Sequence, residues 1–300
     1  MYTYNNKYQT INRADDKNAN DFKTNFKNTK TMIYDSANKK FLGRSKIDWV
    51  KFLAFFFICL ILMIIIFIGM FFLFTEGVIN EDVPYRTGLN SILKNIPNLS
   101  FRPVIDFKTA LIRYSDADPS TYMLYIQSMR ALVQTYEDAD LISEDSYATC
   151  IDGKKTPDDI TKPCRFNILQ LDRCIKQYNF GYDRTKPCVL IKMNRIFGWL
   201  PDIANSSFSK DILIKCAGQN AEDVENFNTV RYYPNVTING VVYGYMSSLY
   251  YPYLVQYGYR QPLVGVEFDR PKKNVLLMIT CHIVNLLTKS APLTFEILID

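Results

Sequence analysis

One stretch of the chain has no polar pattern at all. Residues 52–74 form 23 positions without a charge or a proline, bounded by Lys51 and Glu76. A helix rises about 1.5 Å per residue, so the run can cross a hydrocarbon core of roughly 30 Å. A buried helix of a soluble protein rarely stays apolar on every face for so long, and a cleaved signal peptide has a shorter apolar core. The run predicts a single transmembrane helix, with expected bounds 49–75.

Charges on either side of this run predict its orientation. The first 48 residues carry ten Lys or Arg and five Asp, whereas the first charges after the run are Glu76, Glu81 and Asp82. Basic flanks stay in the cytosol. We therefore expect residues 1–48 to form a disordered cytosolic tail, rich in Asn and Lys and without a helical period. The chain is then a single-pass type II membrane protein whose helix is a signal anchor.

The pattern changes twice after the membrane run. Residues 76–115 contain scattered prolines and predict a membrane-proximal connector. Asp118 and Pro119 are typical of a helix N-cap and first turn, and apolar residues then recur at steps of three and four. This period predicts an amphipathic helix of about 17 residues. Its stripe is interpreted as packing: Tyr122, Tyr125, Met129, Leu132, Val133 and Tyr136.

From Cys150 onward, short runs of Val, Ile, Leu and Tyr alternate with Gly, Pro, Asn and Asp. Such runs predict strands, and strands at this spacing favour an antiparallel sandwich. Residues 116–300 are therefore expected to form one β-rich extracellular domain that carries one helix. The predicted strands are 165–169, 188–192, 212–216, 229–233, 241–245, 263–268, 274–283 and 293–299.

Six of the seven cysteines lie in the part predicted to be extracellular, and Cys59 lies in the membrane run. An even set in an oxidising compartment predicts disulfides. Zinc is a poor alternative, because no two cysteines have the spacing of zinc ligands and His282 is the only histidine. Loop length and spacing favour one pairing: Cys150–Cys164, Cys174–Cys188 and Cys216–Cys281.

The sequence offers little for catalysis. With one histidine, most His-dependent mechanisms are excluded, and common nucleophile, zinc-protease and phosphate-binding motifs do not occur. Two D-x-D tripeptides, at Asp116 and Asp118 and at Asp138 and Asp140, match metal-dependent glycosyltransferases, but the first is better explained as a helix cap. Residues 49–300 carry as many acidic as basic side chains, which argues against nucleic-acid binding. We expect no catalytic residue, cofactor or metal.

Two further features concern the surface of the extracellular part. Tyrosine is concentrated in Tyr250, Tyr251 and Tyr253, and tyrosine is favoured at interfaces because it buries a large area and keeps a polar tip. We interpret this segment as a partner contact, with the alternative that half of its rings fill the core. N-x-[S/T] sequons predict N-glycans at three positions: Asn98, Asn205 and Asn235.

Several blocks of residues are specific when they are taken together: 41–44 with Trp49 and Lys51, 111–114 with 118–122, 164–166, Cys174, 181–182, 186–188, 192–198, 250–253 and 261–268. In this order they resemble the beta subunit of the sodium/potassium-transporting ATPase and its relative in the proton/potassium pump. The likeness covers about residues 41–300.

The resemblance implies an immunoglobulin-like ectodomain and a non-catalytic subunit of a P-type ATPase at the plasma membrane. The catalytic alpha subunit of such a pump hydrolyses ATP and moves the ions, and the beta subunit serves its folding, its membrane delivery and its ion affinity. Membrane lipid and a small single-span regulatory subunit are further implied partners. The implied contacts with alpha are Trp49, Phe55, Phe56, Gly69, Tyr250, Tyr251 and Tyr253.

The chain also departs from the family pattern. Phe56 and Leu60 stand where family members place tyrosines, and Ile61 and Ile65 stand where they carry spaced glycines. The contact face on the helix is therefore left open. Two alternatives also remain open, namely the beta subunit of a proton/potassium pump and a stand-alone adhesion or lectin-like glycoprotein. A lumenal glycosyltransferase is a third alternative, and it would depend on the D-x-D motifs.

Overall fold

The computed structural model describes residues 34–35, 39–42, 44–80, 83–87, 91, 96–106, 108–151, 154–155, 161–204 and 209–300. The predicted tail up to residue 33 and the sequon at Asn205 lie outside the described residues. The described residues fall into two compact units that divide after Gly77.

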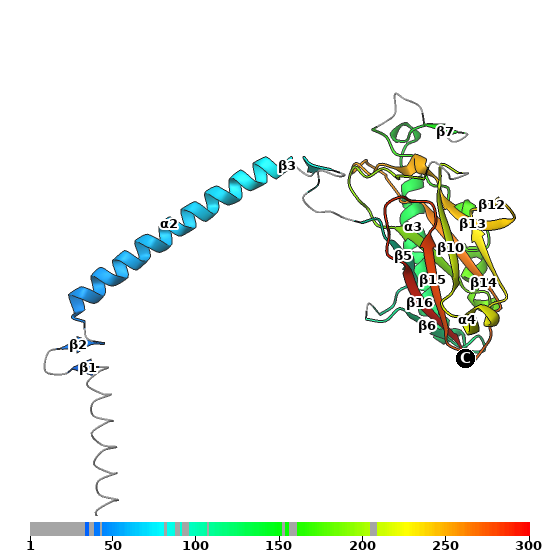
Figure 1. Ribbon diagram of the computed structural model, residues 1–300, viewed down its shortest axis with the longest axis horizontal. Helices are drawn as coiled ribbons and strands as arrows, with labels where there is room; N and C mark the ends of the chain where they lie inside the picture. The colour runs from blue at the N-terminus through cyan, green and yellow to red at the C-terminus, as the bar shows by residue number, and fades with distance from the viewer. Residues whose placement is uncertain are drawn as a thin grey trace, which may run out of the picture. The chain divides into compact units, whose positions relative to one another are not determined.

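The first unit is built on one long helix, α2, which runs from Lys46 to Val78 (Figure 1). A capping box fixes its start, because Ser45 Oγ accepts the Asp48 N–H at 3.3 Å and the Asp48 carboxylate accepts the Ser45 N–H at 3.2 Å. Among the described helices, α2 is the one that is long and apolar enough to span a membrane, and its most apolar window buries no residue within the protein. The predicted helix is confirmed as an element, and it extends three residues beyond the predicted bounds 49–75 at each end.

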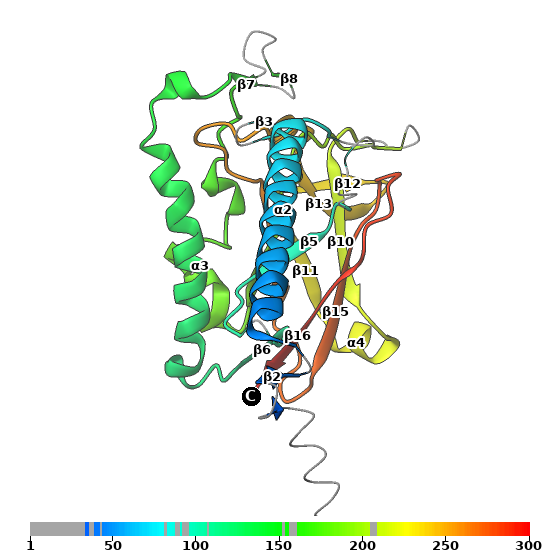
Figure 2. The same ribbon diagram turned by 90° about the vertical axis from the view of Figure 1, so that its left-hand side faces the viewer.

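The second unit is a sandwich of two sheets (Figures 1 and 2). All pairs in it are antiparallel except β16–β6, so the predicted antiparallel sandwich is confirmed with one parallel pair. The six-stranded sheet has the order β12 (Asn235–Ile238), β13 (Val241–Met246), β10 (Ile212–Gly218), β15 (Leu277–Ile283), β16 (Leu293–Ile299) and β6 (Leu111–Tyr114). The four-stranded sheet has the order β11 (Thr229–Tyr233), β14 (Leu263–Asp269), β9 (Cys188–Met193) and β5 (Leu99–Arg102).

The core lies between the two sheets. Along β16 the buried residues alternate with more exposed ones, and Phe295 stacks on Phe101 of β5 with a centroid distance of 4.9 Å. Strands β9 and β14 are buried at nearly every position, because the 3₁₀ segments η5 (Lys176–Arg184) and η4 (Ile168–Leu171) contact them as well. These two strands therefore have continuous apolar runs instead of alternation.

Helix α3 (Pro119–Asp140) runs alongside the strands (Figure 2). Asp118 caps it as predicted, since its Oδ1 accepts the Ser120 N–H at 2.9 Å. Of the predicted stripe, α3 buries Tyr122, Met129, Val133 and Tyr136, whereas Tyr125 and Leu132 are half-buried. Ile126 and Ala139 are buried although the predicted stripe does not include them. Asp116 pairs with Lys273 and accepts a hydrogen bond from Thr185 Oγ1 at 2.9 Å. The first D-x-D motif therefore serves helix capping and surface pairing.

Some predicted elements differ from the structure. The predicted strand 165–169 is wrong, because Asn167 caps η4 and turns the chain into a 3₁₀ segment. The predicted strand 274–283 begins only at Leu277, since Asn274 has a positive φ of 57°. Strands β5, β6 and β12 of the sandwich are not among the strands predicted from the sequence. Both β5 and β6 come from the stretch expected to be a connector, and they find their partners far along the chain in β9 and β16.

The remaining elements are short. They are β1 (Tyr34–Asp35), β2 (Lys40–Phe41), β3 (Ile79–Asn80), β4 (Val83–Pro84), β7 (Cys150–Ile151), β8 (Lys154–Lys155), α4 (Ala221–Asn226), η2 (Glu144–Ser146) and η6 (Ser248–Tyr250).

Three disulfides close the second unit. The pairs are those that the spacing favours: Cys150–Cys164, Cys174–Cys188 and Cys216–Cys281. Cys216 and Cys281 stand opposite each other on β10 and β15, so this bond joins neighbouring strands within one sheet. Cys59 of α2 is free.

Candidate functional site

Helix α2 presents an apolar surface that nothing in its own unit covers. Phe55 and Phe56 are exposed, and a Cβ added at Gly69 would meet no atom within 4 Å. Trp49 is half-buried, because its indole N–H donates to the Phe41 carbonyl at 2.8 Å and its ring lies 5.7 Å from that of Phe52. In water such a surface would be strongly unfavourable, so it must face lipid or other helices.

The four residues of α2 that are predicted to contact a partner (Trp49, Phe55, Phe56 and Gly69) do not lie on one stripe of the helix. With about 3.6 residues per turn, Phe56 returns to the side of Trp49, and Gly69 returns to the side of Phe55. The two pairs lie on neighbouring faces of α2, roughly a third of a turn apart. A partner that contacts all four residues must therefore cover a broad part of the helix, or contact it with more than one helix.

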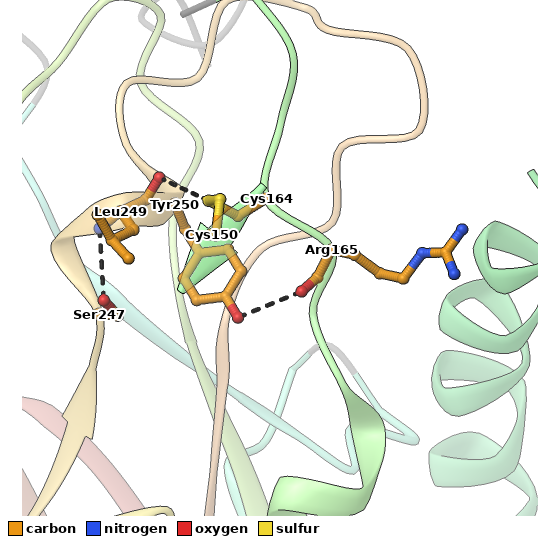
Figure 3. The surroundings of a disulfide bond; sticks show 6 residues. All are labelled: Cys150, Cys164, Arg165, Ser247, Leu249 and Tyr250. Atoms are coloured by element: carbon orange, nitrogen blue, oxygen red, sulfur yellow. Dashed lines mark hydrogen bonds between the residues drawn. A yellow bond between two sulfur atoms is a disulfide. The ribbon is translucent and has the colours of Figure 1, made fainter. Parts of the chain in front are cut away.

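Tyr250 ends the short segment η6, and it packs against the first disulfide (Figure 3). The Leu249 carbonyl oxygen lies 3.4 Å from Cys164 Sγ, and the Tyr250 hydroxyl lies 3.5 Å from the Arg165 carbonyl oxygen. The Arg165 side chain points away from Tyr250 (Figure 3), and it donates to the Ile142 carbonyl at 2.8 Å. The disulfide and Arg165 therefore fix the start of the tyrosine segment.

The next tyrosines differ in what they contact. Tyr251 lies edge-on to Trp199 at 5.4 Å, and its hydroxyl lies 3.8 Å from Met193 Sδ. Tyr253 is half-buried, as are Tyr250 and Tyr251. Its ring lies 4.9 Å from that of Tyr259, and its carbonyl accepts the Gly198 N–H at 2.9 Å. Tyr250 and Tyr251 pack against the main hydrophobic core and position the segment, whereas these contacts of Tyr253 are with neighbouring loops.

Several residues near this segment could not be identified as its neighbours from the sequence. The Arg195 guanidinium lies 5.5 Å from the Tyr253 ring centroid and 5.9 Å from that of Tyr259. Tyr257 is 74% exposed, and Leu200 is 61% exposed close to the bridge between residues 197 and 253. Isolated exposed apolar residues give no periodic signal, and a ring–cation contact between distant segments has no local signature in the sequence.

Ionisation is suppressed within the tyrosine segment. Burial raises the pKa of Tyr250 to about 12 and that of Tyr251 well above its ordinary value. Both hydroxyls are therefore protonated at neutral pH, as hydrogen-bond donation requires. Among the described residues, no group of three or more His, Cys, Asp or Glu side chains could hold a metal ion.

Two of the three sequon asparagines are described, and both are exposed. Asn98 accepts the Ala291 N–H through its Oδ1 at 3.2 Å, which leaves its amide nitrogen directed elsewhere. Asn235 Nδ2 donates to the Tyr232 carbonyl at 2.9 Å. An N-glycan retains one N–H on this nitrogen, so either position is chemically compatible with the modification.

Comparison with known proteins matches residues 19–291 to the family described as sodium / potassium ATPase beta chain. The chain is 26% identical to sodium/potassium-transporting ATPase subunit beta-2 of Drosophila melanogaster over 285 residues, 85% of each chain. It is 27% identical to subunit beta-1 of Tetronarce californica over 281 residues, 85% of this chain and 88% of that one. It is 26% identical to subunit beta-2 of Homo sapiens over 267 residues, 85% of each chain.

The family match spans most of the chain, and it includes the apolar helix, the three disulfides and every strand of the sandwich except β16. The resemblance inferred from the ordered sequence blocks is thereby confirmed. The chain belongs to the sodium/potassium ATPase beta chain family.

Proposed function

We propose that this chain is the non-catalytic beta subunit of a sodium/potassium-transporting P-type ATPase, which assists the folding, membrane delivery and ion affinity of a catalytic alpha subunit. The relatives named above are subunits of that pump. Their names favour the sodium pump over a proton/potassium pump and over a stand-alone adhesion glycoprotein. A small single-span regulatory subunit is a further partner under this proposal.

The observation that carries the proposal is the uncovered surface of α2. Within its own unit, the apolar window of α2 has no buried side chain, and the second unit closes its own core around Phe295 and Phe101. A self-sufficient ectodomain on an unpartnered apolar helix is suited to association inside the bilayer. There, close helix packing and not water exclusion supplies the attraction.

Co-purification tests the partner contact. The chain is co-expressed with a sodium-pump alpha subunit, solubilised in mild detergent and captured through a tag on the alpha subunit. We expect the double change Phe55→Ala and Phe56→Ala to lower the recovered beta subunit severalfold, because it removes two exposed rings from the proposed contact. Phe57→Ala is the control, since Phe57 is similarly exposed and lies outside the arc of the helix that contains both pairs.

Unchanged recovery of the double variant would remove these residues from the contact. Loss of recovery in Phe57→Ala as well would indicate a general defect of the helix. Absence of the wild-type beta chain from the material captured through the alpha subunit would refute the proposed function itself.

The proposed topology places the N-terminus in the cytosol, the second unit outside the cell and the protein in the plasma membrane. Residues 1–48 form the cytosolic tail, 49–75 the membrane span, 76–115 the connector and 116–300 the glycosylated ectodomain. Glycans at Asn98, Asn205 and Asn235 follow from this topology. Glycosidase treatment of intact cells tests it, because each glycan removed from a surface-labelled chain gives a downward step in apparent mass.

A further inference from the structure

The N-terminal end of α2 carries an excess of positive charge, although Asp35 stands opposite Lys40 in the β1–β2 pair. The acidic side chain among residues 39–51 is Asp48, and its carboxylate is engaged by the Ser45 N–H and by the Ser45 hydroxyl at 2.7 Å. Within the described part of the chain, the basic side chains of this stretch form no ion pair. These side chains are Lys39, Lys40, Arg44, Lys46 and Lys51.

One of these cations is held in place by aromatic rings. The Arg44 guanidinium lies 4.6 Å from the Phe52 ring centroid and 6.0 Å from that of Trp49. The preceding segment folds back onto the helix, because Phe41 and Arg44 exchange two backbone hydrogen bonds and the Trp49 indole N–H donates to the Phe41 carbonyl. A cation that is already fixed loses little entropy when it binds an anion.

The depth of this cluster follows from the sequence. Phe52 is the first residue of the uncharged run and marks the edge of the hydrocarbon core. Trp49 lies one turn earlier, where tryptophan is enriched at the lipid headgroups. Arg44 contacts both rings, so its charge lies at the depth of the lipid phosphates. Lys46 and Lys51 flank it on the same end of the helix.

We propose that these five cations, arranged around Trp49 and named here the basic collar, bind the headgroups of anionic phospholipids. The lipids are those of the leaflet at the N-terminal end of α2. Acidic lipids attract juxtamembrane Lys and Arg, and the collar offers several unpaired charges at the correct depth. The proposal requires that α2 spans the bilayer, and it does not require the alpha subunit.

Trp49 provides a local probe of the bound lipid. The chain has two tryptophans, so Trp199→Phe leaves Trp49 as the sole emitter. The full-length Trp199→Phe chain is reconstituted in nanodiscs that contain either brominated phosphatidylserine or brominated phosphatidylcholine at the same mole fraction. Bromine quenches tryptophan on contact, so the excess quenching by phosphatidylserine measures its enrichment at the collar.

We expect excess quenching by phosphatidylserine at low salt, and its loss at high salt as the charges are screened. Each neutralised cation should lower the association constant for the acidic lipid about fivefold. The variant Lys40→Gln with Lys46→Gln should therefore lose most of the excess without touching the Arg44 contacts. The matched control is Lys272→Gln with Lys289→Gln, which removes two exposed charges from the second unit. This control should retain the excess quenching by phosphatidylserine.

Equal quenching by the two lipids in the parent chain would overturn the proposal, and so would an excess that survives the Lys40→Gln, Lys46→Gln change. Loss of the excess on adding free inorganic phosphate at constant ionic strength would overturn the assignment to lipid. Quenching by neither lipid would mean that Trp49 is not at the membrane. That outcome would refute the topology together with this proposal, whereas failed co-purification with alpha would leave the collar unaffected.

Discussion

The hydroxyl of Tyr232 makes backbone hydrogen bonds that a neighbouring strand would otherwise make at one position of the six-stranded sheet. Strand β13 pairs with β10 only as far as Ile214 and Gly244, and Cys216 lies beyond that point. Cys216 of β10 stands opposite Cys281 of β15, and their Cα atoms are 4.0 Å apart. Such a short separation is typical of an antiparallel pair that exchanges no backbone hydrogen bonds. The amide and carbonyl of Cys216 therefore point away from β15, toward the side that β13 has left.

Tyr232 reaches this gap from the opposite sheet. Its hydroxyl accepts the Cys216 N–H at 2.9 Å and donates to the Cys216 carbonyl at 3.2 Å, and both residues are buried. The change Tyr232→Phe leaves a buried donor and a buried acceptor unpaired. Each orphaned group costs about 1–3 kcal/mol, so we expect a loss of about 2–4 kcal/mol in the free energy of unfolding.

Urea unfolding of the full-length chain in detergent measures this loss through the near-ultraviolet circular dichroism of the second unit. The midpoint should fall while the slope is unchanged, because the change deletes one oxygen and does not alter the exposed surface. Tyr243→Phe is the matched control, since the Tyr243 hydroxyl makes no hydrogen bond within the described residues and its side chain is half-exposed. A loss below about 0.5 kcal/mol, or one equal to that of the control, would refute this account.

Further predictions concern pH and packing. Burial raises the pKa of Tyr233 and of Tyr250 to about 12, so the unfolded chain ionises first and the free energy of unfolding should fall as pH rises from about 10 to 12; tyrosinate absorbance that appears without unfolding would contradict this. The hydrogen bond from Lys186 lowers the pKa of Asp269, so its contribution is present above about pH 4 and is lost as pH falls through the lowered pKa. Lys186→Met should therefore cost about 1 kcal/mol in urea unfolding at pH 7 and much less at pH 2, and an equal cost at both would disprove the pairing. Gly265→Ala should lower the midpoint of thermal unfolding by overpacking worth about 1–3 kcal/mol, because the added Cβ would lie 2.8 Å from the nearest disulfide carbon; an unchanged midpoint would show that this disulfide can shift.

Long periodic features were predictable from the sequence, and features that depend on distant partners were not. The uncharged run and the stripe of α3 carry their signals locally, and Asp118 has the side chain that a cap requires. Strand β6 has only four residues and lies in a proline-bearing stretch, so its pairing with β16 could not be inferred from either segment alone. The same limit applies to the site. Tyrosine density indicated residues 250–253, but only the fold separates the tyrosines that pack from Tyr253.

The parallel pairing of β16 with β6 has a consequence for synthesis of the chain. Strand β6 is made early, yet its neighbour β16 leaves the ribosome only after the other strands of both sheets, and Asp300 next to β16 forms an ion pair with Arg113 of β6 at 2.8 Å. Phe101 of β5 likewise lacks its stacking partner until Phe295 of β16 has been synthesised. The second unit therefore cannot finish its core until β16 has been made, and a chain truncated before β16 would leave β6 without its neighbour in the sheet. Formation of the β6–β16 pair therefore marks the point at which all ten strands of the two sheets have been synthesised.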